Sequence, residues 1–176
     1  GGRAAEAASL NRKYLKYITT GMPYVTLKLA QSLDGKIAAR NGTSKWISSG
    51  KSREMARGMR VDHCAVMVGV NTVLKDDPLL LPKKKKGRVP LRIVVDSRLR
   101  TPVASRVIKT AARNPVILAT TNKAKVSRSA RFRGIPGVEV MAAGRGERVS
   151  IKTLLQRLAR RDIVSVFTEG GGELRG

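Results

Sequence analysis

A glycine triplet, Gly170–Gly172, stands near the C-terminus directly after Glu169 and a short apolar segment. Glycines let backbone N–H groups come close to a phosphate, and the N-terminus of a helix opening at Glu173 would favour the anion. A plain glycine-rich turn explains the same residues, so the triplet alone leaves both interpretations open. The two standard nucleotide-binding patterns, G-x-G-x-x-G and the P-loop with its lysine, do not occur in the sequence.

Other side chains suited to chemistry have structural explanations beside the functional ones. Asp76 and Asp77 could act as paired carboxylates, but the proline that follows them favours a turn or a helix end. Trp46 lies in the polar segment TSKWIS and suits either a ligand-stacking platform or a cap on the core. His63 precedes an apolar segment, which favours a structural role for its ring.

The numbers of histidines and cysteines exclude several enzyme classes. The chain has one of each, His63 and Cys64, so a Ser-His-Asp triad, a Cys-His pair, a cluster of histidine ligands and a disulfide framework are not expected. A lone cysteine is typical of a reducing compartment, and we expect a cytoplasmic protein. No apolar run approaches the ~20 residues that a membrane span needs, and the N-terminus lacks a signal-peptide pattern.

Apolar segments of strand length alternate with helical patterns along the chain. Amphipathic periodicity predicts helices over residues 1–20, over about 51–60 behind the caps Ser48 and Ser49, and after Ser150. The predicted strands are Tyr24–Ala30, Ala65–Gly69, Leu91–Val95, Val116–Ala119, Val138–Met141 and Ile163–Phe167. This pattern indicates an α/β domain with a mostly parallel central sheet flanked by helices.

Parallel sheets bind ligands at the carboxyl ends of their strands. The unusual residues expected at that edge are Asp34-Gly35, Asn71-Thr72, Asp76-Asp77, Asp96-Ser97 and the glycine triplet. We therefore predict one ligand site along this edge of the sheet.

The chain is strongly basic. Lysine and arginine number 36 against 12 acidic residues, a net charge of +24. Such a field attracts polyanions, so the charge fits nucleic acid, a phosphorylated substrate with a pyrophosphate cofactor, or simply a solvated basic surface. Aromatic residues make up 3% of the chain and do not alternate with the basic clusters, which argues against base stacking and makes nucleic acid the weaker alternative.

Several segments, in this order and spacing, resemble the C-terminal reductase domain of the riboflavin-biosynthesis deaminase/reductase (RibD) family, whose fold is like dihydrofolate reductase. The matching segments are PYVTLKLAQSLDGKIA (Pro23–Ala38), GTSKWIS (Gly42–Ser48), CAVMVGVNTVLKDDPLL (Cys64–Leu80), PLRIVVDSRLRTP (Pro90–Pro102) and VFTEGGGEL (Val166–Leu174). Together they extend over nearly the whole chain, which makes the resemblance specific.

The resemblance implies an NADPH-dependent reductase. Its substrate would be the phosphorylated pyrimidine 5-amino-6-(5-phosphoribosylamino)uracil, reduced to the 5-phosphoribitylamino product by hydride transfer to C1′ of the ribose. The cofactor carries the chemistry, and the protein binds and aligns the two partners. A pterin or folate reductase on the same fold is the alternative enzyme, and the DDP and TEGGGEL segments favour the riboflavin branch.

Site residues follow from the resemblance by position within the matching motifs. Lys28 and Glu169 would be catalytic, Lys28 orienting the ribose or supplying a proton and Glu169 facing the pyrimidine. Cofactor contacts would come from Ala30, Trp46, Thr72, Asp76, Ser97, Gly170, Gly171 and Gly172. Substrate contacts would come from Ser44, Arg60, Leu80, Lys83 and Glu169, with Arg60 as a phosphate partner. Arg98 and Arg100 are candidates for the 2′-phosphate of NADPH, and no metal is expected.

The resemblance also suggests how the chain is divided. Residues 1–22 resemble the segment that links a deaminase domain to the reductase, and residues 23–176 form the reductase domain. The further C-terminal strands of the family are not in the sequence, nor is the deaminase zinc motif. The family often has an arginine shortly after DDP-x-L, where this chain has Lys83. A homo-oligomer is expected of the intact parent protein.

Overall fold

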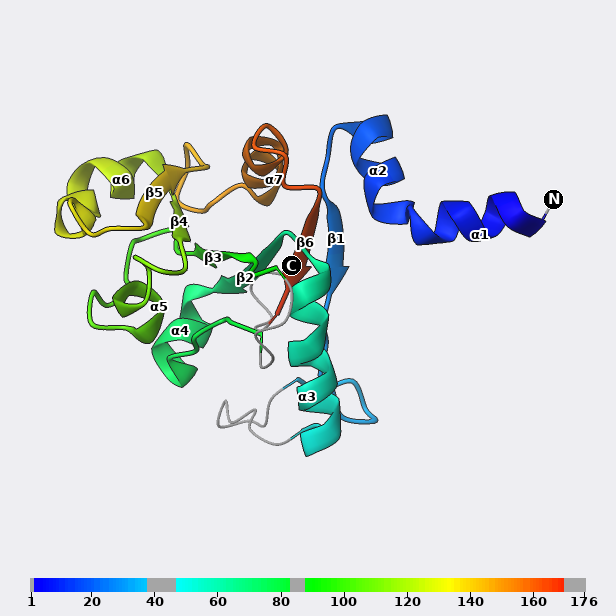
Figure 1. The fold of residues 1–176 in the computed structure, drawn as a ribbon. Coiled ribbons are helices and arrows are strands. Elements are labelled where there is room, and N and C mark those ends of the chain that lie inside the picture. The colour runs from blue at the N-terminus through cyan, green and yellow to red at the C-terminus, as the bar shows by residue number, and fades with distance from the viewer. Residues whose placement is uncertain (1, 38–46, 83–87, 170–176) are drawn as a thin grey trace.

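The computed structural model describes residues 2–37, 47–82 and 88–169. Its centre is a six-stranded sheet in the order β1-β6-β2-β3-β4-β5, in which every described pair of neighbours is parallel. The strands are β1 (Tyr24–Leu27), β2 (Ala65–Gly69), β3 (Leu91–Val95), β4 (Val116–Thr120), β5 (Val138–Ala142) and β6 (Ser165–Thr168). The predicted mostly parallel α/β architecture is confirmed, and Figure 1 shows helices around this sheet.

In the described ranges, two helices precede the first strand and one α-helix connects each successive pair of strands. They are α1 (Gly2–Leu10), α2 (Arg12–Thr20), α3 (Gly50–Gly58), α4 (Val70–Asp76), α5 (Arg106–Lys109), α6 (Asn122–Arg128) and α7 (Ile151–Ala159), with short 3-10 turns η1 (Met59–Asp62) and η2 (Ser129–Phe132). Of the three predicted caps, Ser49 and Ser150 are confirmed, because Ser49 Oγ accepts from the N–H of Ser52 and Ser150 Oγ from that of Thr153. Ser48 precedes the N-cap residue and does not cap the helix.

Each face of the sheet has its own core. Strand side chains alternate between the faces, so Val66, Val94 and Leu118 join one cluster with side chains of α4, α5 and α6. Met67, Ile93 and Ile117 join the other cluster, against Leu154 and Leu158 of α7. Coverage on both faces explains why the central strands are continuous apolar runs.

The N-terminal segment differs from the single helix expected over residues 1–20. It forms two helices that meet at Asn11, whose backbone N–H and side-chain amide both donate to Ala7 O at 3.0 Å. This asparagine competes with the helical hydrogen bonds and breaks the pattern. The Tyr17 hydroxyl ties α2 to the end of α7 by donating to Ala159 O at 3.0 Å, whereas α1 extends away from the sheet (Figure 1).

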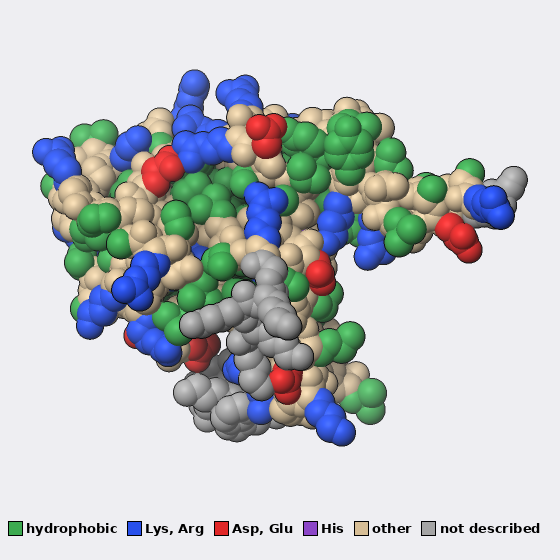
Figure 2. All heavy atoms as spheres, viewed as in Figure 1, with side chains coloured by type: hydrophobic (Ala, Val, Ile, Leu, Met, Phe, Trp, Pro, Cys, Tyr) green, Lys and Arg blue, Asp and Glu red, His purple; other side chains and the backbone are tan. Residues whose placement is uncertain are grey.

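Two surface properties concern possible partners. Figure 2 shows lysine and arginine side chains scattered over the visible face without forming a continuous stripe. None of the helices in the described ranges is long and apolar enough to cross a membrane.

His63 joins η1 to the first strand. Its Nδ1 lies 2.8 Å from Met59 O, and its Nε2 lies 2.8 Å from the Thr26 hydroxyl. A carbonyl only accepts, so Nδ1 carries the proton and Nε2 accepts from Thr26. The ring is also 5.1 Å from that of Phe167 in β6. The neutral histidine thus fixes η1 against β1 and β6, as the structural interpretation predicted.

This arrangement makes the stability of the fold depend on pH. Burial lowers the pKa of His63 below its ordinary value, so the unfolded chain takes up the proton first. The stabilisation is therefore complete above the unfolded-state pKa of about 6.5 and is lost over the pH range below it, as the pH falls toward the lowered folded-state pKa. Urea unfolding across this range should show a falling midpoint for the parent chain and a flatter dependence for His63→Gln. The same dependence of the midpoint on pH in the two proteins would contradict the neutral, buried state assigned to His63.

Candidate active site

Strand pairing brings Lys28 and Glu169 together at the carboxyl edge of the sheet. Leu27 of β1 is in register with Thr168 of β6, and the N–H of Lys28 donates to Thr168 O at 2.9 Å. The N–H of Glu169 donates to Met67 O of β2 at 2.9 Å. Glu169 thus leaves the sheet between β1 and β2, and Lys28 leaves it alongside. The two predicted catalytic residues lie at neighbouring strand ends.

Glu169 is held by a bidentate ion pair with Arg60 of η1. The Nε and Nη2 atoms of Arg60 donate to the two carboxylate oxygens at 2.6 and 2.7 Å, and Nη1 donates to Leu81 O at 2.6 Å. The side chains are 10% and 17% exposed, so the pair is shielded from solvent. A fork of this kind fixes the plane of the carboxylate. Arg60 therefore joins the end of β6 to the loop after α4.

Ser97 stands at the end of β3 on the other side of β2. Its hydroxyl oxygen accepts from the N–H of Val149 at 3.0 Å, and its carbonyl accepts from the hydroxyls of Thr120 and Thr121 at 3.3 and 3.0 Å. These bonds tie together the loops that follow β3, β4 and β5. The O–H of Ser97 remains able to donate to a ligand.

Asp96, also expected at this edge, uses its carboxylate to hold the next loop. Its fully buried carboxylate accepts from the N–H and the hydroxyl of Thr101, both at 2.7 Å, which closes the loop 97–101. The arginines of this loop point outward: Arg98 and Arg100 are exposed, and Arg100 donates to Asn71 Oδ1 at 3.0 Å. The loop thus presents two arginine side chains at the surface, and the bonds between Asp96 and Thr101 hold its backbone.

The two carboxylates before Pro78 do not form a pair at the strand ends. They lie at the far end of α4, about 10 Å from its start at the carboxyl edge. Asp77 accepts from the N–H of Arg106 at 2.8 Å and ends the helix, as the structural interpretation predicted. Asp76 is exposed and lies one turn after the half-buried Thr72, so the two predicted cofactor contacts share a helix face.

The remaining predicted positions divide into three groups. The side chain of Leu80 is 1% exposed and belongs to the core, so a ligand contact at this position would have to come from its backbone. Ala30 is half-buried, three residues beyond β1. Ser44, Trp46, Lys83, Gly170, Gly171 and Gly172 lie outside the described residues.

Comparison with known proteins shows the family of the chain. Residues 23–176 match the family described as RibD C-terminal domain. The chain belongs to the RibD C-terminal domain family. Among curated proteins, the riboflavin biosynthesis protein RibD of Actinobacillus pleuropneumoniae is 39% identical over 170 residues, which cover 96% of this chain and 45% of that protein. The chain thus spans less than half the length of this relative.

A shorter relative and a solved structure support the same family and fold. The 2,5-diamino-6-ribosylamino-4(3H)-pyrimidinone 5′-phosphate reductase of Archaeoglobus fulgidus is 35% identical over 162 residues, 86% of this chain and 72% of that protein. The crystal structure of the diaminohydroxyphosphoribosylaminopyrimidine deaminase/5-amino-6-(5-phosphoribosylamino)uracil reductase of Thermotoga maritima superposes with a TM-score of 0.77 at 34% identity. It matches 97% of this chain and 45% of that chain. The predicted dihydrofolate-reductase-like reductase fold is confirmed.

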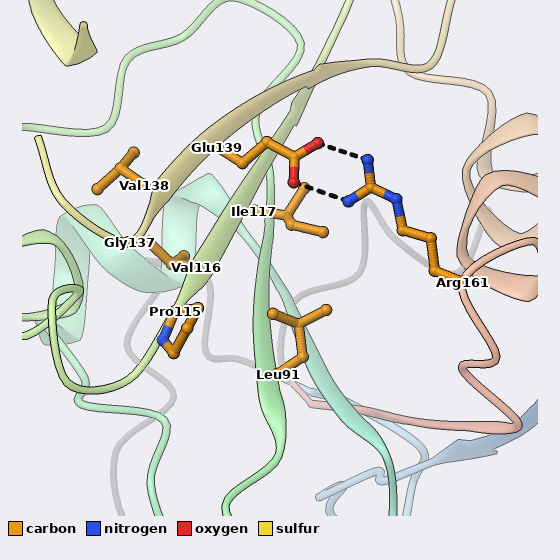
Figure 3. A pocket seen from close by; sticks show the side chains of 8 residues that line it. All are labelled: Leu91, Pro115, Val116, Ile117, Gly137, Val138, Glu139 and Arg161. Carbon is orange, nitrogen blue, oxygen red and sulfur yellow. Dashed lines mark hydrogen bonds and ion pairs between the residues drawn. The ribbon is translucent and has the colours of Figure 1, made fainter. Parts of the chain in front are cut away.

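A hollow of about 250 Å³ lies at the opposite edge of this RibD C-terminal domain. Figure 3 shows it among the first residues of β3, β4 and β5, beside the ion pair of Glu139 with Arg161. Amino ends of parallel strands are not where such sheets bind their ligands, and none of the predicted site residues lines it. Its ion pair serves as a reference for the one in the candidate site.

The two ion pairs should differ in their effect on stability. Glu169→Gln removes the charge opposite a buried arginine, so the free energy of unfolding should fall by about 3 kcal/mol. Glu139→Gln breaks a pair whose side chains are 45% and 46% exposed, and it should cost about 0–1 kcal/mol. Denaturant unfolding of both variants measures the contrast. Equal losses would show that the Arg60–Glu169 pair is not shielded from solvent.

Proposed function

We propose that this chain carries the reductase activity of riboflavin biosynthesis. The reaction is the NADPH-dependent reduction of 5-amino-6-(5-phosphoribosylamino)uracil to the 5-phosphoribitylamino product. The observation that carries the proposal is the carboxylate of Glu169, fixed by Arg60 at the carboxyl edge beside Lys28 in a RibD C-terminal domain. Relatives named as pyrimidinone phosphate reductases support it.

The carboxylate of Glu169 is suited to recognise the pyrimidine. Each oxygen accepts one hydrogen bond from Arg60 and keeps a further lone pair. These lone pairs can accept from a ring N–H and from the amino group of the substrate. Because Arg60 fixes the plane of the carboxylate, the orientation of the base is set before the substrate arrives.

Lys28 would act on the ribosylamine part of the substrate, and Arg60 would bind its phosphate. In the open imine form of the ribosylamine, C1′ takes the hydride and the adjacent nitrogen takes a proton. Lys28, at the strand end next to Glu169, is placed to supply that proton or to orient the ribose. Arg60 commits three of its five N–H donors to Glu169 and Leu81. Two N–H donors remain for the phosphate, and Lys83 would supplement them with a point charge.

The residues at the ends of β2 and β3 fit a dinucleotide with a 2′-phosphate. NADPH, when bound, supplies the hydride. The free O–H of Ser97 can donate to the cofactor, and the exposed guanidinium groups of Arg98 and Arg100 suit the 2′-phosphate. Thr72 and Asp76 offer polar contacts along one face of α4, and the backbone of Ala30 and of the glycine triplet would complete the site.

Cofactor binding can be followed through tryptophan fluorescence, since Trp46 is the single tryptophan of the chain. Titration with NADPH should quench the emission to saturation, whereas NADH should bind more weakly because it lacks the 2′-phosphate. Arg98→Ala should narrow the difference between the two cofactors. A folded chain whose emission responds to neither would contradict the proposal.

Replacing Glu169 by glutamine should weaken the binding of the substrate but not that of the cofactor. The amide turns one acceptor oxygen into a donor, so the KM for the pyrimidine should rise by about tenfold, while the Kd for NADPH stays nearly constant. Steady-state kinetics and the fluorescence titration supply the two numbers, measured at a temperature at which the variant is folded. Equal effects on KM and Kd would remove Glu169 from its role at the pyrimidine.

A further inference from the structure

Arg92, the second residue of β3, is a fully buried arginine. Its Nη1 donates to Leu79 O at 3.1 Å and to the Thr110 hydroxyl at 2.8 Å, its Nη2 donates to Asn114 O, and its Nε has no partner. Within the described part of the chain, no carboxylate pairs with it. Burial lowers its pKa to about 10, so the side chain still carries its charge at neutral pH.

The loop that Arg92 contacts, residues 77–82, is the one that Arg60 contacts from the other side. Arg92 donates to the carbonyl of Leu79, and Arg60 donates to the carbonyl of Leu81. Between these two carbonyls, the side chain of Leu80 is buried in the core. Before them, Asp77 accepts from the N–H of Arg106. The loop is therefore held at four successive non-proline residues.

The backbone of this loop is strained. Asp77 and Leu80 both adopt positive φ angles, 38° and 57°, a region that side chains with a Cβ avoid. Such conformations persist where the surroundings over-determine them, and they concentrate at ligand sites. The two guanidinium groups provide that constraint, because they fix carbonyls on each side of Leu80.

Burying a charged side chain without a carboxylate partner costs desolvation free energy. An apolar side chain at this place would often be equally stable or more stable. An arginine adds directional hydrogen bonds, because its planar guanidinium donates to the carbonyls of two irregular segments at once. The benefit of Arg92 thus lies in the position of the loop.

We propose that Arg92 is a positioning residue for substrate binding, which sets loop 77–82 in the geometry that contacts the phosphorylated pyrimidine. The inference deepens the proposed function and rests on it, since Leu80 is one of the predicted substrate contacts. Arg60 links the same loop to Glu169, so a correct loop position also sets the distance between the loop and the carboxylate that recognises the base.

The test compares Arg92→Met and Arg92→Lys with Arg161→Met in the same chain. Arg161→Met is the matched control, because Arg161, like Arg92, lies near the amino ends of the strands and donates two hydrogen bonds, but to Glu139 and not to loop 77–82. Calorimetry with the 5-phosphoribitylamino pyrimidine should give a Kd about tenfold higher for Arg92→Met and intermediate for Arg92→Lys, with NADPH affinity constant to about twofold. Hydrogen–deuterium exchange should accelerate in residues 77–82 of Arg92→Met and stay unchanged there in Arg161→Met.

Each other outcome overturns part of the proposal. Unchanged pyrimidine affinity in Arg92→Met, despite faster exchange in the loop, would show that the loop position does not serve the ligand. If Arg92→Met weakens the binding of the pyrimidine and of NADPH by similar factors, Arg92 has a general structural role instead. If the parent chain binds no pyrimidine, the proposed function fails and the ligand role of Arg92 fails with it. The exchange experiment then still decides whether Arg92 holds the loop.

Discussion

The site depends on the insertion of β6 between β1 and β2. The last described strand of the chain pairs in parallel with two strands that precede it by about 140 and 100 residues. Because of this pairing, Glu169 leaves the sheet between Lys28 and the start of α4. Without it, the carboxylate would have no fixed relation to the residues that are expected to meet the substrate. The loops at the carboxyl edge therefore lie on both sides of Glu169.

Much of this fold follows from local patterns in the sequence. The strands β2 and β3 are continuous apolar runs with unambiguous ends, and the prediction is correct to the residue. Ser49 and Ser150 were predicted caps because a hydroxyl before an amphipathic segment satisfies an otherwise free N–H. The short helices α5 and α6 were not predicted, since four and seven residues rich in basic side chains show too little apolar periodicity. The break at Asn11 was missed for a similar reason, because it depends on one side-chain hydrogen bond.

The contacts inside the site were less accessible to sequence reasoning. The resemblance to a family indicated that Arg60 and Glu169 both belong to the substrate site, but not that they bind each other across 109 positions of sequence. Nor does any local pattern show that the arginine of LRIVV is buried, since an arginine in a strand is normally read as the solvent-facing residue. The positive φ angles of Leu80 and Leu99 are equally invisible, because leucine is not a residue that signals a left-handed turn.

The two leucines show that the loops on either side of the site are built in the same way. Leu99, like Leu80, has a positive φ angle and a fully buried side chain, and its carbonyl accepts from Arg131, which also donates to Thr101 O. In both loops a buried leucine anchors a strained backbone, and guanidinium groups from distant segments donate to carbonyls at or beside that leucine. Part of the excess of basic residues therefore serves the architecture, because arginine supplies N–H donors that no other side chain can offer in a fork. The net charge by itself is thus a poor guide to partners: Arg60, Arg92 and Arg131 act on the protein's own carbonyl groups.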